Sequence, residues 1–202
     1  MKLLMWNVIT NWIVLLVKEP VMNRDDLGKL YPITVVPYDA NWTSQFKNEK
    51  QILTNILSSE IALRIEHIGS TAVPHLSAKP TIDILVEIPK ENGVSNLVIS
   101  KMTQNNYIHM KEQKNHLMFI KGYSPTGLEK KSFHIHMGTK DLNFLWDRVY
   151  FRDYLRANPT VAKQYEDLKF KLAEIYKYDR EAYTENKTEF IREITKLAKE
   201  RS

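Results

Sequence analysis

The sequence predicts an α+β domain in which a mixed β-sheet is flanked by helices and followed by a helical C-terminal third. Three observations support this class. Short β-branched runs alternate with amphipathic segments between residues 31 and 137. From Leu142 onward, apolar residues recur with the period of an α-helix. The chain has 202 residues and contains no internal repeat or linker-like segment, which predicts one main domain over residues 22–202.

The first elements are an edge strand and a helix. Tyr31 to Pro37 (YPITVVP) is a β-branched run between prolines, which is typical of an edge strand. Asp39 or Asn41 can cap the helix that follows. Apolar residues of that helix lie on one stripe, which predicts a core-facing side: Trp42, Phe46, Ile52 or Leu53, Ile56 and Leu57.

Two strands, a helix and a hairpin come next. Arg64 to Ile68 reads as a strand that ends at Gly69, and Thr81 to Ile88 alternates cleanly. In the second strand one face carries isoleucine and valine, while the other carries Asp83, Leu85 and Glu87. A helix is predicted within residues 90–106. Residues 117–121 and 132–137 then predict a hairpin with a long, mobile connection.

The C-terminal third predicts three helices. The first runs from Leu142 to about Ala157 and ends near Asn158, because the residue before Pro159 avoids the helical region. The other two are indicated by apolar stripes, which are Val161, Tyr165, Leu168, Leu172 and Ile175, and then Phe190, Ile191, Ile194, Leu197 and Ala198.

Composition limits the classes of function. The absence of cysteine excludes disulfides, thiol catalysis and thiolate zinc sites, and it suits a reducing compartment, so we expect a cytoplasmic protein. The net charge of +5 favours anionic small-molecule partners such as phosphates. Because 24 acidic residues are interleaved with the basic ones, the composition does not indicate a nucleic-acid partner.

Residues 1–21 stand apart as an apolar extension. Met1 to Val17 is shorter than the ~20 apolar residues that a membrane-spanning helix requires. Polar residues interrupt it, and no small-residue cleavage site precedes Glu19. We expect a dispensable extension; a membrane-associating helix and a signal peptide are the alternatives.

The region from Ile65 to Glu87 carries the sharpest functional signal. Gly69 ends a strand, and Ser70 and Thr71 follow where a helix could begin, which is a favourable place for an anion. Asp83 then projects from the next strand, so a carboxylate and an anion-binding turn are predicted to lie together. The chain has neither a G-x-x-x-x-G-K-[ST] loop nor a G-x-G-x-x-G loop, which disfavours the ATPase and dinucleotide folds that depend on them.

Further candidates come from other segments. Lys79 lies at a loop-to-strand junction, where it could meet a phosphate as a point charge or remain solvated. His134 and His136 point the same way from one strand, and His67 joins them if the strands are neighbours; a polar pocket wall is favoured over a zinc site. Arg152 belongs to a basic stripe with a four-residue period, which reads either as a solvated face or as an arm lining the anion site.

The run HIGSTAVPHLSAKPTIDILVEI strongly resembles the signature of the GrpB family, H-x-G-S-T-A-V-P-x-L-x-A-K-P-x-I-D. The resemblance continues through VVPYDANW, FHIHM, FRDYLRANP and a tail that fits Y-x-x-x-K-x-x-F-I from Tyr183. It covers Tyr31 to Ile194 and leaves residues 1–21 uncovered. The family looks like a branch of the polymerase-beta-type nucleotidyltransferase superfamily, and members occur fused to dephospho-CoA kinase in some bacteria.

The resemblance implies a minimal nucleotidyltransferase core that binds a nucleoside triphosphate and Mg²⁺. Asp83 matches the first metal-binding carboxylate, and Glu87 lies on the same face as a further candidate ligand. The superfamily usually has a second acid two residues after the first, where this chain has Leu85. Asp83 and His136 are the expected catalytic residues. The expected phosphate-binding residues are His67, Gly69, Ser70, Thr71, Lys79, His134 and Arg152.

Three functions remain open on this reading. The first is a nucleotidyltransferase acting on a small molecule or a protein. The second is a non-catalytic module that holds a nucleotide or a CoA-like phosphate. The third is an accessory protein that associates with a membrane through residues 1–21.

A chain that starts at Met22 is expected to fold like the full chain, because the predicted core and the family resemblance both begin after residue 21. Thermal unfolding monitored by circular dichroism would measure this. A Met22-start chain that still partitioned with vesicles would contradict a membrane role for residues 1–21.

Overall fold

The computed structural model describes residues 24–111, 113 and 115–201, so the predicted extension lies outside the described residues. In chain order the elements are α2 (Arg24–Leu30), α3 (Asn41–Leu57), β1 (Arg64–Ile68), η1 (Ser70–Ala72), β2 (Thr81–Glu87), α4 (Val94–Gln104), β3 (Ile108–His109), β4 (Leu117–Ser124), β5 (Gly127–Gly138), α5 (Asn143–Ala157), α6 (Pro159–Ile175) and α7 (Arg180–Glu200). Within these ranges no helix is long and apolar enough to cross a membrane.

The sheet has the order β1-β2-β5-β4-β3 and is mixed, as predicted. β2 and β5 run parallel at its centre, and the other neighbouring pairs are antiparallel. In the parallel pair Asp83 lies opposite His134, and Leu85 lies opposite His136. The register therefore places the strand carboxylate and both predicted histidines side by side.

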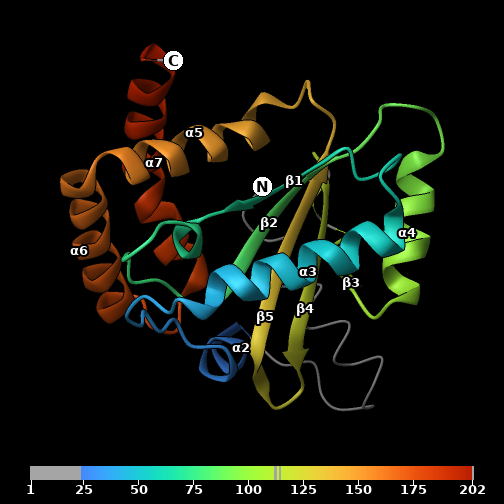
Figure 1. The fold of residues 1–202 in the computed structure, drawn as a ribbon. Coiled ribbons are helices and arrows are strands. Elements are labelled where there is room, and N and C mark those ends of the chain that lie inside the picture. Colours follow the sequence, from blue (N-terminus) through green and yellow to red (C-terminus); the bar gives the residue numbers. More distant parts are fainter. Residues whose placement is uncertain (1–23, 112, 114, 202) are drawn as a thin grey trace.

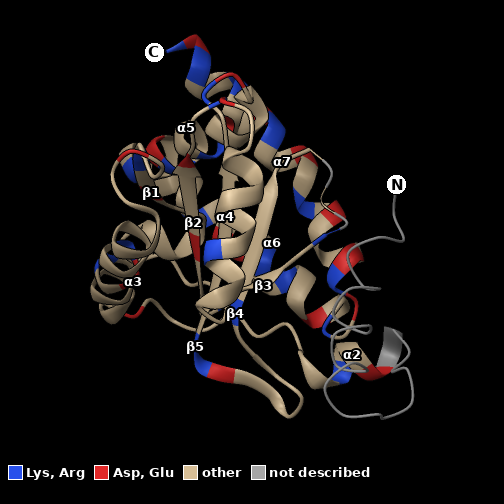
Figure 2. Ribbon diagram, turned by 90° about the vertical axis from the view of Figure 1, so that its right-hand side faces the viewer, with Lys and Arg blue, Asp and Glu red and all other residues tan. Residues whose placement is uncertain are grey.

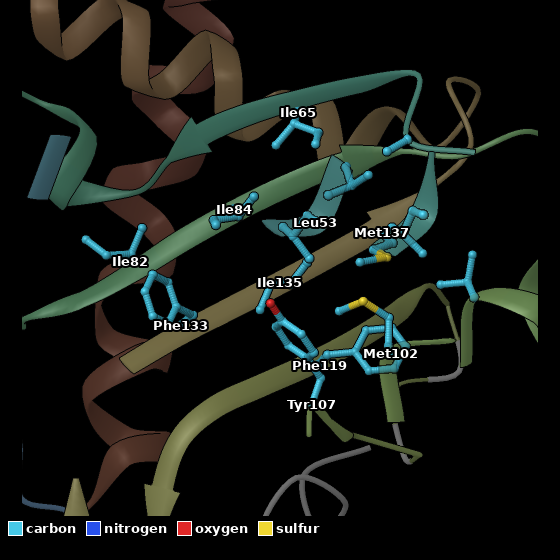
Figure 3. Packing of buried hydrophobic residues seen from close by; sticks show 14 of the residues in the cluster. Leu53, Ile65, Ile82, Ile84, Met102, Tyr107, Phe119, Phe133, Ile135 and Met137 are labelled. Atoms are coloured by element: carbon cyan, nitrogen blue, oxygen red, sulfur yellow. The ribbon is translucent and has the colours of Figure 1, made fainter. Parts of the chain in front are cut away.

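The main hydrophobic core lies between one face of the sheet and the helices α3 and α4. Figure 3 shows strand side chains gathered on this face against Leu53 of α3 and Met102 of α4. The residues that β2 and β5 contribute alternate along each strand: Ile82, Ile84, Val86, Phe133, Ile135 and Met137. Because these alternate residues are buried in the core, the predicted period-2 alternation of β2 is confirmed.

Helices of the C-terminal third cover the other face. In Figure 1, α3 crosses in front of the sheet and α7 passes behind it. Leu85 packs on this rear face against Leu145 and Trp146 of α5. α5, α6 and α7 pack on one another through a separate cluster that includes Phe151, Tyr165 and Ile194. The predicted helical C-terminal third is confirmed.

The predicted edge strand at Tyr31 to Pro37 is wrong. In the described chain this segment forms a single β-bridge, in which Val36 and Ala78 exchange two backbone hydrogen bonds of 2.9 Å. Ile33 instead packs on Leu172 and Ala173 of α6, and its N–H donates to the carbonyl of Lys177. Tertiary packing against α6 takes the place of strand pairing here.

The hairpin is tighter than predicted. β4 extends to Ser124 and β5 begins at Gly127, so only Pro125 and Thr126 connect them rather than a long loop. The longer strands pair across a bulge at Gly122. This position requires glycine, because φ is +81° and a Cβ there would lie 2.0 Å from the carbonyl oxygen of Lys131.

A buried ion pair joins α3 to the sheet. Glu49 is 3% exposed, and its carboxylate accepts bonds of 2.9 and 3.2 Å from Lys121 Nζ on β4. The Tyr107 hydroxyl also donates to Glu49. This cluster fixes the position of α3 over the sheet, and removing Lys121 would leave the Glu49 carboxylate buried without its cation.

Glu49→Ala is expected to lower the free energy of unfolding by about 2 to 3 kcal/mol, because Lys121 and Tyr107 would lose their acceptor. Urea unfolding would measure the change. Glu60→Ala is the matched control, since Glu60 is exposed beyond the end of α3. An equal loss in both variants would contradict the role given to the buried pair.

Candidate functional site

A cavity of about 950 Å³ lies on the rear face of the sheet, between the strands and the helices α5, α6 and α7. Its wall includes the turn after β1, the rear faces of β2 and β5, and one side of α7. Eight Lys or Arg residues and three Asp or Glu residues line it. Figure 2 shows basic and acidic residues interleaved along α6 and α7, the helices that close this side. Because basic residues outnumber acidic ones in the wall, the cavity is cationic and fits an anionic ligand.

The turn after β1 requires glycine. Gly69 has φ +73°, and a Cβ there would lie 2.5 Å from Asp83 Oδ2. Beyond it, Ser70–Ala72 forms a single 3₁₀ turn, so no α-helix begins where the sequence suggested one could. Ser70 and Thr71 both reach the cavity wall. Any anion at this turn would be held by backbone N–H groups, hydroxyls and nearby cations rather than by the dipole of a long helix.

Asp83 lines the cavity and is oriented by a chain of hydrogen bonds. His134 Nδ1 is 3.2 Å from Asp83 Oδ1, and the Tyr123 hydroxyl is 2.6 Å from His134 Nε2. Arg180 Nη1 in turn donates to the Tyr123 hydroxyl at 3.4 Å. Both nitrogens of His134 are thereby engaged. Oδ2 of Asp83 has no donor among the described residues and remains for a ligand.

Asp83 is held as a carboxylate. Burial alone would raise its pKa, but the hydrogen bond and charge of His134 outweigh this and lower the pKa, with help from Lys79 and Arg148. Its side chain is 31% exposed, so the charge is open to the cavity.

Four cations surround this carboxylate: Lys79, Arg148, Arg180 and Lys187. None of the four forms an ion pair within the described part of the chain. Burial and the charge of Arg180 lower the pKa of Lys79 to about 7, although Asp83 opposes the shift. Burial and the charge of Lys79 lower the pKa of Lys187 to about 8. The cluster holds more positive charge than the protein itself neutralises.

A second group of side chains forms a neutral part of the wall. His116 Nε2 and His136 Nδ1 lie 3.0 Å apart, and both residues line the cavity. Burial lowers the pKa of His116 to about 4 and that of His136 well below its ordinary value, and Arg148 adds to both shifts. At neutral pH the two rings are uncharged, and one donates an N–H hydrogen bond to the other. Phe144 packs edge-on against His116, so this end of the cavity offers aromatic surface and neutral hydrogen-bonding groups.

Some predicted site residues have structural roles instead. Arg152 is 6% exposed and does not line the cavity, because its guanidinium donates to Glu66, to the carbonyl of His67 and to Asp153. His67 is also outside the wall; its ring stacks on Phe46, and Nε2 lies 3.0 Å from the Thr71 hydroxyl. Both residues support the turn at Gly69 from behind.

The basic stripe of α5 does reach the cavity, but through Arg148. Both arginines lie on one face of α5, but Arg152 lies one turn further along and meets β1, while Arg148 lines the wall beside Asp83. Arg180, Lys187 and His116 are also wall residues that motif spacing did not select. Lys187 had a signal in the sequence, since it is the lysine of the Y-x-x-x-K-x-x-F-I tail.

The structure does not bring Glu87 to Asp83. Glu87 lies four residues further along β2, about 13 Å away by the strand rise, and it does not line the cavity. Leu85 stands between them, 0% exposed, against Ile68, Leu145 and Trp146. Among the described residues, no group of three or more His, Cys, Asp or Glu side chains is placed to hold a metal ion.

Leu85→Asp is expected to destabilise the fold by more than about 3 kcal/mol, because it removes a buried apolar side chain and buries a charge. Thermal or urea unfolding measures the loss, and Leu85→Asn is the matched control, since it loses the same packing without adding charge. A Leu85→Asp protein as stable as wild type would contradict the packing argument.

Comparison with known proteins agrees with the fold and the motif. The model of the family described as "GrpB protein" matches residues 32–197. A curated relative, "Glutamate-rich protein GrpB" of Alkalihalophilus pseudofirmus, is 33% identical over 80% of this chain and 93% of its own length. "UPF0157 protein YqkA" of Bacillus subtilis is 34% identical over 84% of this chain, and the match spans only 49% of that protein.

A solved structure has the same fold. The crystal structure of "conserved protein GrpB" from Enterococcus faecalis superposes with a TM-score of 0.72 at 33% sequence identity. The match covers 83% of this chain and 98% of that one. Sequence and structure agree over the region that carries the cavity, and the chain belongs to the GrpB family.

Proposed function

We propose that the cavity binds a nucleotide through its phosphate groups and that the protein transfers a nucleotidyl group to a small-molecule or protein acceptor. One observation carries this: Asp83, which lies against Gly69, and four cations that form no ion pair within the described residues line one cavity of about 950 Å³. A cavity of this size can enclose a nucleotide. Its charge selects a ligand with several negative charges close together, which is the character of a di- or triphosphate.

The cavity also has room for the uncharged part of such a ligand. The neutral His116–His136 pair and Phe144 line the same cavity as the cationic cluster. Arg148 is the link between the two, since its charge affects Asp83 as well as His116. A ligand with a polyphosphate at one end and a planar, neutral group at the other suits both parts of the wall.

In the transfer reaction, an acceptor oxygen or nitrogen would form a bond to the α-phosphorus while the bond to the bridging oxygen breaks and pyrophosphate leaves. Oδ2 of Asp83 is the group placed to take the acceptor proton. Lys79, Lys187 and Arg148 would stabilise the negative charge that develops on the phosphate oxygens and on the leaving group.

Magnesium, which the family resemblance implies, fits this site poorly. Two-metal phosphoryl transfer requires paired carboxylates, and here the position two residues after Asp83 is the buried Leu85. The other two acidic residues of the wall, Asp147 and Glu200, are paired with Lys199 and Lys196. The residues do not form a metal site of that kind, and no step of the proposed reaction is assigned to a metal ion.

A second candidate function is a phosphate-holding module without turnover. The buried Leu85 favours it, because the superfamily's second acid is replaced by a packing residue. In that case the same cavity would hold a nucleotide or a CoA-like phosphate without forming a product.

Asp83→Asn is expected to abolish transfer of label from an α-³²P nucleoside triphosphate to acceptors in a desalted extract, because it removes the proton acceptor while keeping the shape of the side chain. Product appearance in the wild type and its loss in the variant, followed by chromatography, is the measurement. Asp167→Asn is the matched control, since Asp167 is exposed on α6 and outside the cavity. Unchanged transfer by Asp83→Asn would contradict its role, and binding without any product would favour the module.

A further inference from the structure

We infer that the protein binds the phosphate groups of its ligand as a metal-free polyphosphate, with the side-chain cations Lys79, Lys187, Arg148 and Arg180 in the place of divalent metal ions. The inference deepens the proposed function, on which it rests for the phosphate character of the ligand. It names the form in which the ligand is taken and the groups that recognise it.

The first support is the balance of charge. With both lysines protonated, the four cations carry four positive charges against the one negative charge of Asp83, so the cluster has a net charge of +3. A divalent cation entering this space would meet repulsion from every side except that of Asp83. A polyphosphate would meet attraction from every side except that of Asp83.

The second support is the number of unused donors. Arg180 Nη2 is buried and has no hydrogen-bond partner among the described residues. Arg148, Lys79 and Lys187 also make no side-chain hydrogen bond within the described chain, and Lys187 Nζ lies 4.0 Å from the centroid of the Tyr183 ring. Guanidinium and ammonium donors without acceptors match phosphate oxygens, which accept several such bonds at once.

Lys169 is excluded from the cluster although it lines the same cavity. Its ammonium donates to the carbonyl of Ser77, and Glu166 accepts from the N–H of Ser77 at 2.8 Å. Lys169 therefore supports the loop that leads to Lys79. Because Lys169 belongs to α6, the position of Lys79 depends on the packing of α6 against this loop.

Proton linkage separates the two ways of binding phosphate. Lys79 faces Asp83, Arg180 and Lys187, and Lys187 faces the same carboxylate and arginine. Their pKa values, about 7 and about 8, mean that both lysines are partly deprotonated at pH 8. An arriving polyphosphate raises both pKa values, so binding takes up protons and weakens as the pH rises from 7 to 9. A metal ion at the same place would lower them and release protons.

Calorimetric titration of the full chain with inorganic tripolyphosphate tests the inference. The titration is run at pH 8 with EDTA and again with Mg²⁺, in two buffers with different ionisation enthalpies. We expect binding in EDTA and no gain in affinity from Mg²⁺. Binding that requires Mg²⁺, or no binding in EDTA, would overturn the inference.

Substitutions then test the assignment to these side chains. Lys187→Met is expected to weaken tripolyphosphate binding in EDTA by about tenfold or more and to reduce the proton uptake, because a buried charge partner of the anion is lost. Lys171→Met is the matched control, since Lys171 is exposed on α6 and outside the cavity. If Lys187→Met does not fold, the Mg²⁺ dependence of binding to the wild-type protein still decides. Equal affinity in both variants would overturn the assignment.

A parallel titration with ATP keeps the two proposals apart. ATP that binds only with Mg²⁺, while tripolyphosphate fails in EDTA, would overturn the metal-free inference and leave the proposed function standing. Tripolyphosphate that binds in EDTA without competition from any nucleoside triphosphate would support the inference and contradict the proposed function.

Discussion

The parallel pairing of β2 with β5 is the constraint on which the site depends. It places Asp83 opposite His134, so the imidazole can donate to the carboxylate and hold it in its ionised form. It also directs one set of alternate residues into the core beneath α3 and the other set toward the rear helices. A shift of one residue in register would bury Asp83 in the hydrophobic core. The strength of the core packing and the chemistry of the cavity are thus two consequences of one pairing.

The rear face divides into a packed part and an open part along the same strand. At Leu85, α5 covers the sheet, and an apolar side chain fills the space between Ile68 and Trp146. Asp83, two positions earlier on the same strand, lines the cavity instead. A carboxylate at position 85 would be unfavourable, because its charge would lie inside an apolar cluster. The cations from α5 and α7 supply positive charge to the space that remains.

Much of the frame could be predicted from the sequence. The alternation in Thr81 to Ile88 and the stripes of the C-terminal helices identify elements whose burial pattern repeats along the chain. The Gly69-Ser70 turn and Asp83 were also identifiable, since a motif of short range contains them. Tyr31 to Pro37 was misread because Ile33 and Val35 pack against α6, and that contact leaves no trace in local spacing. The hairpin was read as a long loop because the bulge at Gly122 breaks the alternation there.

What the sequence by itself determined is local: the periods of the strands and helices, the glycine turn, and the single carboxylate on β2. Only the tertiary structure decided which cations surround that carboxylate. Arg148 and Arg152 lie one turn apart on the same helix. The packing of α5 on the sheet nevertheless places Arg148 in the cavity wall, while Arg152 forms ion pairs with Glu66 and Asp153. Arg180 and Lys187 lie 97 and 104 residues after Asp83 in the chain. Long-range packing sets such distances, and no local pattern records them.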